Sequence, residues 1–139
     1  MCVSVCVFVQ ANDDVEGALG LCGENLIIYH NPQSTVAPMF GKFYGVEGVA
    51  QWLKTCADEF EMKTKPRYFN FSASGPYVYF EAEVTVTVRR TKKTVTLSRM
   101  QKFMFDENGL MVAWDIMEDS AQLTAVCLFI NKTPLLCTE

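Results

Sequence analysis

The second half of the chain alternates between apolar and polar residues. Residues 77–89 place an apolar side chain at every second position, and 94–106 do so except at two polar positions, 99 and 101; this is the period of a β-strand that buries one face. A charged tip at 90–93 separates these two segments, and an Asn-Gly pair at 108–109 favours a tight turn after the second one. Shorter segments complete the predicted set of antiparallel strands at 68–74, at 110–117 and, as one further candidate, at 125–130.

The first half of the chain has the longer period of an amphipathic helix. Within 46–60 the apolar residues recur three or four positions apart, which predicts a helix with one buried stripe. Helices that precede a series of antiparallel strands are typical of the α+β class, so we expect a helical part packed on a sheet. The residues of the stripe are Val46, Val49, Ala50, Leu53, Ala57 and Phe60.

The region before this helix predicts shorter elements. A short helix is expected from Val15 to Cys22, and Gly23 is a natural residue at which to end it. The apolar run 26–29 predicts a strand that the Asn-Pro pair at 31–32 ends, and a loop rich in Pro, Ser and Thr then continues to about Gly45. With 139 residues, the whole chain from 1 to 139 is expected to form one domain.

Composition and charge restrict the partners of the protein. A net charge of -4 and an isoelectric point of about 5.0 disfavour nucleic acid and anionic membranes, which attract clustered Lys and Arg. The six cysteines form no Cys-x-x-Cys pair and the chain has a single histidine, so we expect no metal and no cofactor. We interpret the cysteines as reduced core residues, which favours a cytoplasmic location.

Three segments of the chain carry a recognisable series of motifs: Asn-Asp-Asp-Val-Glu and Leu-Ile-Ile-Tyr-His-Asn-Pro, then Phe-Tyr-Gly-Val-Glu-Gly-Val, then Lys-Phe-Met-Phe with Val-Ala-Trp-Asp-Ile. In this order they resemble the nuclear transport factor 2-like superfamily, in particular its SnoaL-like branch. The segment from Phe8 to Pro32, with its Asn-Asp-Asp-Val-Glu and Leu-Ile-Ile-Tyr-His-Asn-Pro motifs, resembles the opening of these domains. The motif Phe-Tyr-Gly-Val-Glu-Gly-Val at 43–49 resembles the entry to their third helix, and 102–116 resembles their final hairpin. The resemblance implies a cone-shaped, curved sheet, a central apolar pocket closed by helices, and often a homodimer formed through the sheet.

The resemblance also suggests where chemistry would be located. Ketosteroid isomerases of this fold carry a general-base Asp at the position of Asn31, and Asn cannot take up a proton at neutral pH. They carry an acid that holds an oxyanion at the position of Gln101, which can still donate a hydrogen bond. SnoaL-like cyclases carry a catalytic Asp at the position of Asp115. Because proteins of this fold have many activities, only the pocket residues can decide the function.

The two candidate catalytic residues are Asp115 and His30, and alternation limits both. Neighbouring residues of a strand point to opposite faces, so only one of His30 and Asn31 and only one of Trp114 and Asp115 can face the pocket. Both residues also have a purely structural interpretation. His30 would then lie at the surface or be hydrogen-bonded at the strand end, and Asp115 would lie on the solvent or dimer face. A buried imidazole or carboxylate would suit acid–base catalysis.

A second set of residues is expected to bind a ligand. Arg99 and Gln101 interrupt the apolar face of the strand 94–106, where they form either a polar floor of the pocket or a solvent-exposed pair. Alternation with Phe103 places Gln101 on the buried face. The residues expected to bind a ligand are Gln101, Arg99, Asn31, Tyr29, Trp114, Trp52 and Phe103.

Three functions remain open from the sequence. The first is a binding domain for a small hydrophobic molecule with a carbonyl or carboxylate end, without catalysis of its own. The second is a cyclase, isomerase or hydrolase that uses Asp115 or His30 as its acid or base. The third is an assembly module that dimerises through the polar and aromatic face of the sheet, which carries Tyr77, Tyr79, Glu81, Glu83 and Thr85.

Overall fold

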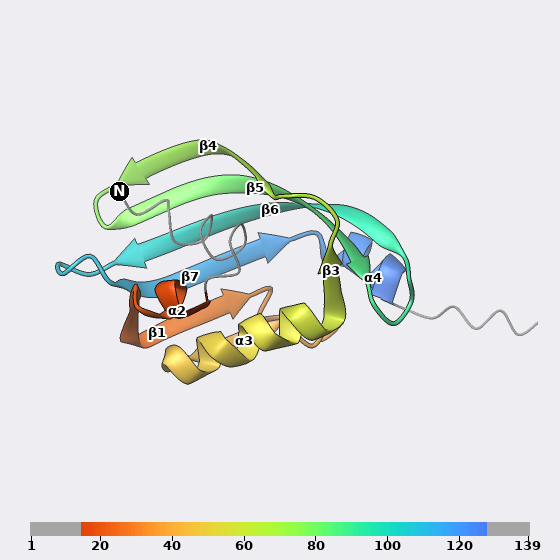
Figure 1. The fold of residues 1–139 in the computed structure, drawn as a ribbon. Helices are drawn as coiled ribbons and strands as arrows, with labels where there is room; N and C mark the ends of the chain where they lie inside the picture. Colours follow the sequence, from red (N-terminus) through yellow and green to blue (C-terminus); the bar gives the residue numbers. More distant parts are fainter. Residues whose placement is uncertain (1–14, 128–139) are drawn as a thin grey trace, which may run out of the picture.

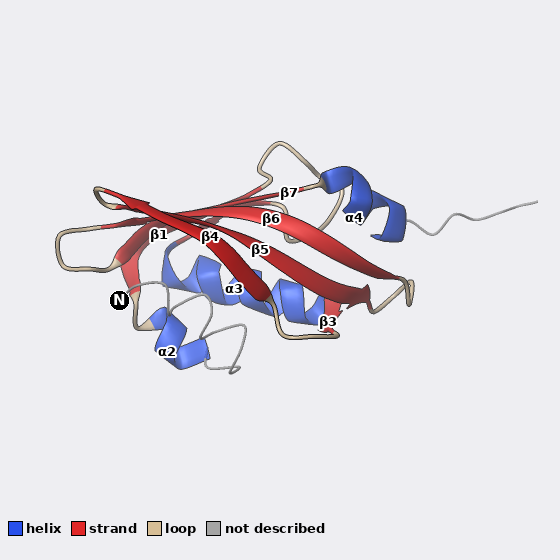
Figure 2. Ribbon diagram, turned by 90° about the horizontal axis from the view of Figure 1, so that it is seen from above, coloured by secondary structure: helices blue, strands red, loops and turns tan. Residues whose placement is uncertain are grey.

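A curved, seven-stranded sheet wraps around one long helix in the computed structural model, which describes residues 15–127 (Figure 1). The strands run in the order β2-β1-β7-β6-β5-β3, and β4 pairs with β5 beyond this path. The helix α3 lies against the concave face of the sheet, and α4 lies at one end of it (Figure 2). None of the helices in this described part is long and apolar enough to cross a membrane.

The elements have the following bounds. The helices are α2 (Val15–Leu19), α3 (Gly45–Glu59) and α4 (Ser120–Cys127). The strands are β1 (Cys22–His30), β2 (Gly41–Tyr44), β3 (Phe60–Met62), β4 (Arg67–Ser74), β5 (Tyr77–Val88), β6 (Thr94–Phe105) and β7 (Met111–Glu118).

The strongest sequence patterns are confirmed. The two long alternating segments are β5 and β6, which pair antiparallel over eleven consecutive positions from Tyr77 to Thr87. The amphipathic segment is confirmed as the helix α3, which buries Val49 and Trp52, but the predicted stripe is wrong at three positions: Val46 and Ala57 are exposed, and Phe60 is the first residue of β3. The result is the α+β, cone-like arrangement that the resemblance implied.

The sheet is mixed rather than wholly antiparallel. β1 pairs in parallel with β7, while β6 pairs antiparallel with β7 on its other side. This parallel pair also explains why the helix predicted from Val15 to Cys22 ends earlier than expected. α2 ends at Leu19, and the expected stop residue Gly23 belongs to β1, where a Cβ atom would lie 3.3 Å from the carbonyl oxygen of Met111. Gly23 therefore serves the close approach of the two strands and does not end a helix.

Three further differences lie in short or terminal elements. β2 occupies the end of the segment predicted as a loop, and β3 follows α3 directly; both are short and exist through pairing with β1 and β5. The segment predicted as a strand at 125–130 is, as far as the structure describes it, the last turn of α4, which buries Leu123 and Cys127. Its residues 128–130 lie outside the described part of the chain.

Candidate functional site

Four polar side chains are buried on the concave face, and we call them the buried polar group: His30, Arg99, Gln101 and Glu118. The register of the sheet brings them together, because Gln101 lies opposite Ile116 and Ile116 lies opposite His30. In the next row Arg99 lies opposite Glu118. His30, Arg99 and Gln101 are at most 6 % exposed, and the side chain of Glu118 is fully buried.

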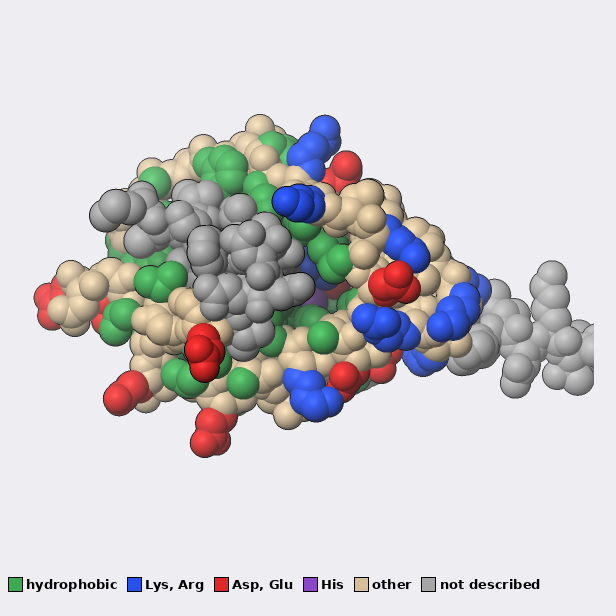
Figure 3. Space-filling model, in the orientation of Figure 1, with side chains coloured by type: hydrophobic (Ala, Val, Ile, Leu, Met, Phe, Trp, Pro, Cys, Tyr) green, Lys and Arg blue, Asp and Glu red, His purple; other side chains and the backbone are tan. Residues whose placement is uncertain are grey.

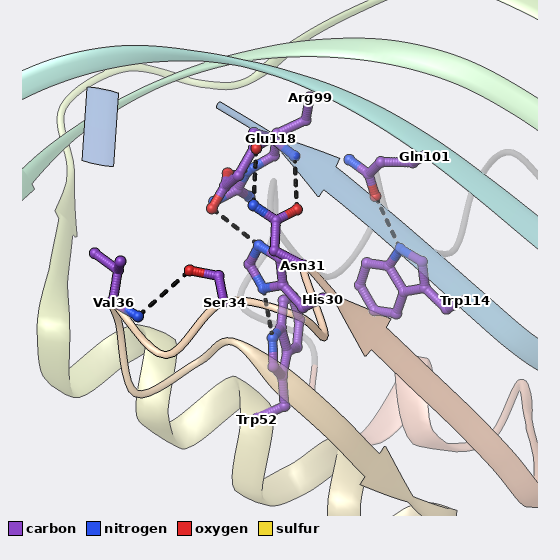
Figure 4. A network of polar contacts seen from close by, with 9 residues as sticks. All are labelled: His30, Asn31, Ser34, Val36, Trp52, Arg99, Gln101, Trp114 and Glu118. Carbon is purple, nitrogen blue, oxygen red and sulfur yellow. Dashed lines mark hydrogen bonds and ion pairs between the residues drawn. The ribbon is translucent and has the colours of Figure 1, made fainter. Parts of the chain in front are cut away.

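His30 makes a hydrogen bond with each of its ring nitrogens (Figure 4). The indole nitrogen Nε1 of Trp52 donates to Nδ1 at 3.1 Å, so Nδ1 carries no proton. The proton of the neutral ring is therefore on Nε2, which lies 2.9 Å from Oε1 of Glu118 and donates to it. Burial lowers the pKa of His30 and outweighs the opposing effect of Glu118, so the ring is neutral near pH 7.

Glu118 and Arg99 form a buried ion pair. Nε of Arg99 donates to Oε2 of Glu118, and the two side chains are 5 % and 0 % exposed. Burial alone would raise the pKa of Glu118, but the charge of Arg99 and the hydrogen bond from His30 outweigh it and hold this pKa at about 2. Near them on α3, burial raises the pKa of the Cys56 thiol to about 12, so this thiol is neutral.

Asn31 fastens the end of β1 to the end of β7. Its amide nitrogen donates to the backbone oxygen of Glu118 at 2.7 Å, and its amide oxygen accepts from the backbone nitrogen of Glu118 at 3.0 Å. Asn31 has a left-handed φ of 36°, a conformation that Asn tolerates better than most residues. The residue at the position of the isomerase base thus has both ends of its amide engaged in holding the backbone of Glu118.

Gln101 is held by Trp114. The indole Nε1 of Trp114 donates to Oε1 of Gln101 at 2.9 Å, as Figure 4 shows. Gln101 is 1 % exposed and lies on the same face as the buried Phe103, which confirms the orientation that alternation predicts. Its amide nitrogen Nε2 has no hydrogen-bond partner within the described residues.

Aromatic rings form the wall around this group. The rings of Trp52 and Trp114 are 4.8 Å apart, and Phe103 lies 5.3 Å from both Trp114 and Phe80. In the space-filling view a hollow opens between the sheet and α3, and a histidine side chain is visible among hydrophobic side chains at its bottom (Figure 3). The chain contains one histidine, so this hollow leads to the buried polar group.

Two of the candidate residues lie on the opposite, convex face of the sheet. Asp115 is half-buried there and pairs with Lys102 at 2.5 Å. Tyr29 lies opposite Asp115 in the register. The Nζ atom of Lys42 lies over its ring, 5.7 Å from the ring centroid. The structure therefore brings His30, Arg99, Gln101, Trp52, Trp114 and Phe103 together, places Asn31 at their edge, and leaves Asp115 and Tyr29 outside the group.

Glu118 is not among the site residues expected from the sequence. The signal that could have found it is alternation, since Glu118 shares a face with Trp114 and Ile116. A carboxylate on an apolar face next to a strand that carries an inward Arg predicts a buried ion pair. What alternation could not supply is the register, which decides that Glu118 lies opposite Arg99.

No protein-family model matches the chain, and no curated protein matches its sequence. Solved structures do match it. An NTF2-like protein of unknown function from Burkholderia pseudomallei has a TM-score of 0.82 at 18% identity, and the match covers 92% of this chain and 95% of that chain. The chain has the nuclear transport factor 2-like fold.

Two further structures share this fold. A protein from Mycobacterium tuberculosis in complex with estradiol-17β-hemisuccinate has a TM-score of 0.72 at 14% identity, with 87% of this chain and 93% of that chain covered. A protein described as a SnoaL-like polyketide cyclase, from Mesorhizobium loti, has a TM-score of 0.67 at 15% identity, with 84% and 94% covered. At these identities the likeness establishes the nuclear transport factor 2-like fold and leaves the activity to the residues of the site.

The ion pair of this site can be tested with a double-mutant cycle. We expect Glu118→Leu to lower the free energy of unfolding by about 3 kcal/mol, because it leaves the Arg99 charge buried without a partner. Arg99→Met should cost about as much for the converse reason. The double variant should recover part of the loss, with a coupling energy of about 2 kcal/mol in urea denaturation. Additive losses would show that the two charges do not stabilise each other.

The same group predicts that the fold weakens in acid. The pKa of His30 is lowered by folding from 6.5, so the unfolded chain binds a proton more readily and stability is lost as the pH falls below 6.5. The pKa of Glu118 is lowered from 4.5 to about 2, so a second loss follows as the pH falls below 4.5.

The control for this pH dependence is His30→Gln, which can still accept from Trp52 and donate to Glu118 but does not titrate. Urea denaturation should show a smaller loss of stability between pH 6.5 and 4.5 in His30→Gln than in the parent. Identical curves in this interval would show that His30 is not the titrating group.

Proposed function

We propose that the concave face binds a small, hydrophobic, carbonyl-bearing molecule and performs no chemistry on it. One observation carries this proposal: the ionisable groups of the buried polar group satisfy one another. Glu118 accepts hydrogen bonds from both His30 and Arg99, and His30 uses both ring nitrogens within the protein. An acid or base needs a free position toward its substrate, whereas a binding site needs a stable wall with few polar contacts.

The apolar wall and the amide donor of Gln101, which has no partner within the described residues, suit such a ligand. The rings of Trp52, Phe103 and Trp114 offer apolar contact area, and Gln101 offers an amide N–H for an oxygen acceptor. The nuclear transport factor 2-like protein from Mycobacterium tuberculosis was crystallised with estradiol-17β-hemisuccinate, which supports a hydrophobic ligand for this fold. We also expected Arg99 to bind the ligand, but Arg99 forms an ion pair with Glu118 instead.

Catalysis by His30 is the alternative that the geometry favours less. His30 is on the concave face and is bonded to a carboxylate, as a general base often is. To accept a proton at Nδ1 it would first have to lose the hydrogen bond from Trp52. Asp115, the other candidate, would have to act from the convex face, where Lys102 holds it. The catalytic role of both residues stays a prediction.

Intrinsic fluorescence tests the proposal directly, because both tryptophans of the chain, Trp52 and Trp114, lie in the wall. We expect hydrophobic ketones to change the tryptophan emission in a saturable way, and proton NMR of each ketone recovered after incubation should show an unchanged compound. Glu107→Ala in the exposed turn between β6 and β7 is the control and should bind equally well. A parent protein that binds no hydrophobic ketone would contradict the proposal, and conversion of the ketone would favour the catalytic alternative.

We also propose that the convex face forms a homodimer. Large apolar side chains are exposed there: Tyr79 at 38 %, Met100 at 52 % and Met117 at 52 %. A shallow groove of about 310 Å³ lies beside them, and Phe69 and Glu81 contribute to its lining. Such a mixture of apolar and polar surface suits a partly hydrated interface between two copies of the chain.

Light scattering at micromolar concentration is expected to give the mass of a dimer, and the variant Met100→Glu/Met117→Glu should give that of a monomer. A parent protein that is monomeric at this concentration would overturn the dimer.

The acidic balance of the chain still disfavours nucleic acid and membranes as partners, and the cytoplasmic location stays a prediction.

A further inference from the structure

The ring of His30 connects the sheet to α3 in a way that depends on its protonation state. Nδ1 accepts the indole N–H of Trp52, which lies on α3, and Nε2 donates to Glu118 on β7 (Figure 4). Within residues 15–127 the ring has no hydrogen-bond partner besides these two. An indole N–H can donate but cannot accept, so the bond from Trp52 exists only while Nδ1 carries no proton.

A proton on Nδ1 would break this connection. Two N–H groups would then face each other across the 3.1 Å that separate Nε1 of Trp52 from Nδ1 of His30. Rotation of the ring cannot restore the bond, because both nitrogens of an imidazolium carry a proton and only one side of the ring faces Glu118. His30 and Trp52 are at most 1 % exposed, so each would hold a buried donor without an acceptor, which is unfavourable.

The groups around His30 oppose its protonation in the closed structure. Arg99 on β6 and Glu118 on β7 are the charged groups that act on the ring, and they already form an ion pair. On α3 the thiol of Cys56, whose pKa is about 12, is neutral, and before β2 the ring of Phe40 packs on the imidazole at 4.9 Å. A proton on His30 would therefore place a second positive charge beside one carboxylate, out of contact with water.

Proton uptake is for this reason coupled to opening of the contact. Burial lowers the pKa of His30 in the closed structure, whereas a ring that has left the contact and meets water has its ordinary pKa of 6.5. Above pH 6.5 neither state binds the proton, and the opening equilibrium is constant. Below pH 6.5 the open state binds it more readily, so the open fraction rises by up to about tenfold for each unit that the pH falls. Glu118, with a pKa of about 2, stays ionised throughout this range.

We infer that the Trp52–His30 hydrogen bond is a pH-sensitive contact that controls access to the concave face: protonation of His30 breaks it, separates α3 from β1 and speeds the release of a bound molecule. This inference concerns the regulation of the site and rests on the proposed binding function. Trp52 belongs to the aromatic wall, with its ring 4.8 Å from that of Trp114, and α3 covers the concave face (Figure 2). The closed state stays predominant, so the dissociation rate rises while the affinity changes little.

The two tryptophans of the chain allow a test with an internal control, because each indole N–H has its own NMR signal and its own acceptor. Hydrogen exchange of both is measured at pH 7.5 and 5.5 and expressed as protection relative to free indole at the same pH. The protection of Trp52 should fall about tenfold between these values, as the uptake of one proton by the open state requires. Trp114 is bonded to Gln101 within the sheet, so its protection should not change.

Two variants assign the effect to His30. His30→Gln keeps an acceptor for Trp52 and a donor for Glu118 but does not titrate, so the protection of Trp52 should be the same at both pH values. Glu107→Ala, in the exposed turn between β6 and β7, is the matched control and should behave like the parent. If His30→Gln does not fold, the comparison of the two indoles in the parent still decides.

The release of a bound molecule is measured with acetophenone as the probe, by NMR exchange between its free and bound forms. Its dissociation rate should rise about tenfold in the parent from pH 7.5 to 5.5 and stay constant in His30→Gln. A rate that does not depend on pH, although Trp52 loses its protection, would overturn the control of release.

Three outcomes of the exchange experiment contradict the inference: equal protection of Trp52 at both pH values in the parent, the same fall in His30→Gln, or a fall of Trp52 and Trp114 together. The last would indicate global unfolding rather than separation of α3 from β1. If acetophenone and other hydrophobic ketones do not bind the parent at either pH, the proposed function fails, while the two indole signals still decide whether the contact opens.

Discussion

One buried carboxylate constrains the whole concave face. The side chain of Glu118 is fully removed from water, and an unpaired charge there would be far too unfavourable for a domain of this size. Arg99 supplies the counter-charge from β6, and His30 supplies a hydrogen bond from β1. Asn31 holds the backbone of the same residue. Because Trp52 then bonds to His30, the arrangement around Glu118 connects three neighbouring strands to α3.

This arrangement has a cost and a consequence for the chemistry of the site. A buried ion pair often stabilises a protein no more than apolar residues of the same size would, whereas the loss of one partner leaves a buried charge and is strongly destabilising. Here it fixes the ends of β1 and β7, where a parallel pair meets an antiparallel sheet. It also consumes the charges of the concave face. The buried residues beside this pair are mainly aromatic, and among the described residues the amide nitrogen of Gln101 is left there without a hydrogen-bond partner.

The two faces of the sheet divide the chemistry of the chain between them. The residues of β7 alternate so that Trp114, Ile116 and Glu118 face α3, while Asp115 and Met117 face outward. Asp115 pairs with Lys102 beside exposed apolar side chains, which suits an interface with another molecule better than a catalytic cavity. A difference of one residue in the register would exchange these two sets, and the fixed alternation of the strands therefore keeps Glu118 and Trp114 on the concave face and the Asp115–Lys102 pair on the convex face.

The sequence by itself determined the elements with strong periodicity and the face of each side chain in them. The alternation of β5 and β6 sufficed for this and placed Gln101 and Phe103 on the buried face, whereas the period of α3 predicted the helix but not that Trp52 is buried and Val46 exposed. Only the tertiary structure decided which strands are neighbours. The tertiary structure sets the parallel pairing of β1 with β7 and the short strands β2 and β3. It also sets the contacts of Glu118 with Arg99 and His30. The physical reason is that alternation is a local property of the backbone, whereas register and pairing are set by contacts between residues as far apart in the chain as Cys22 and Met111.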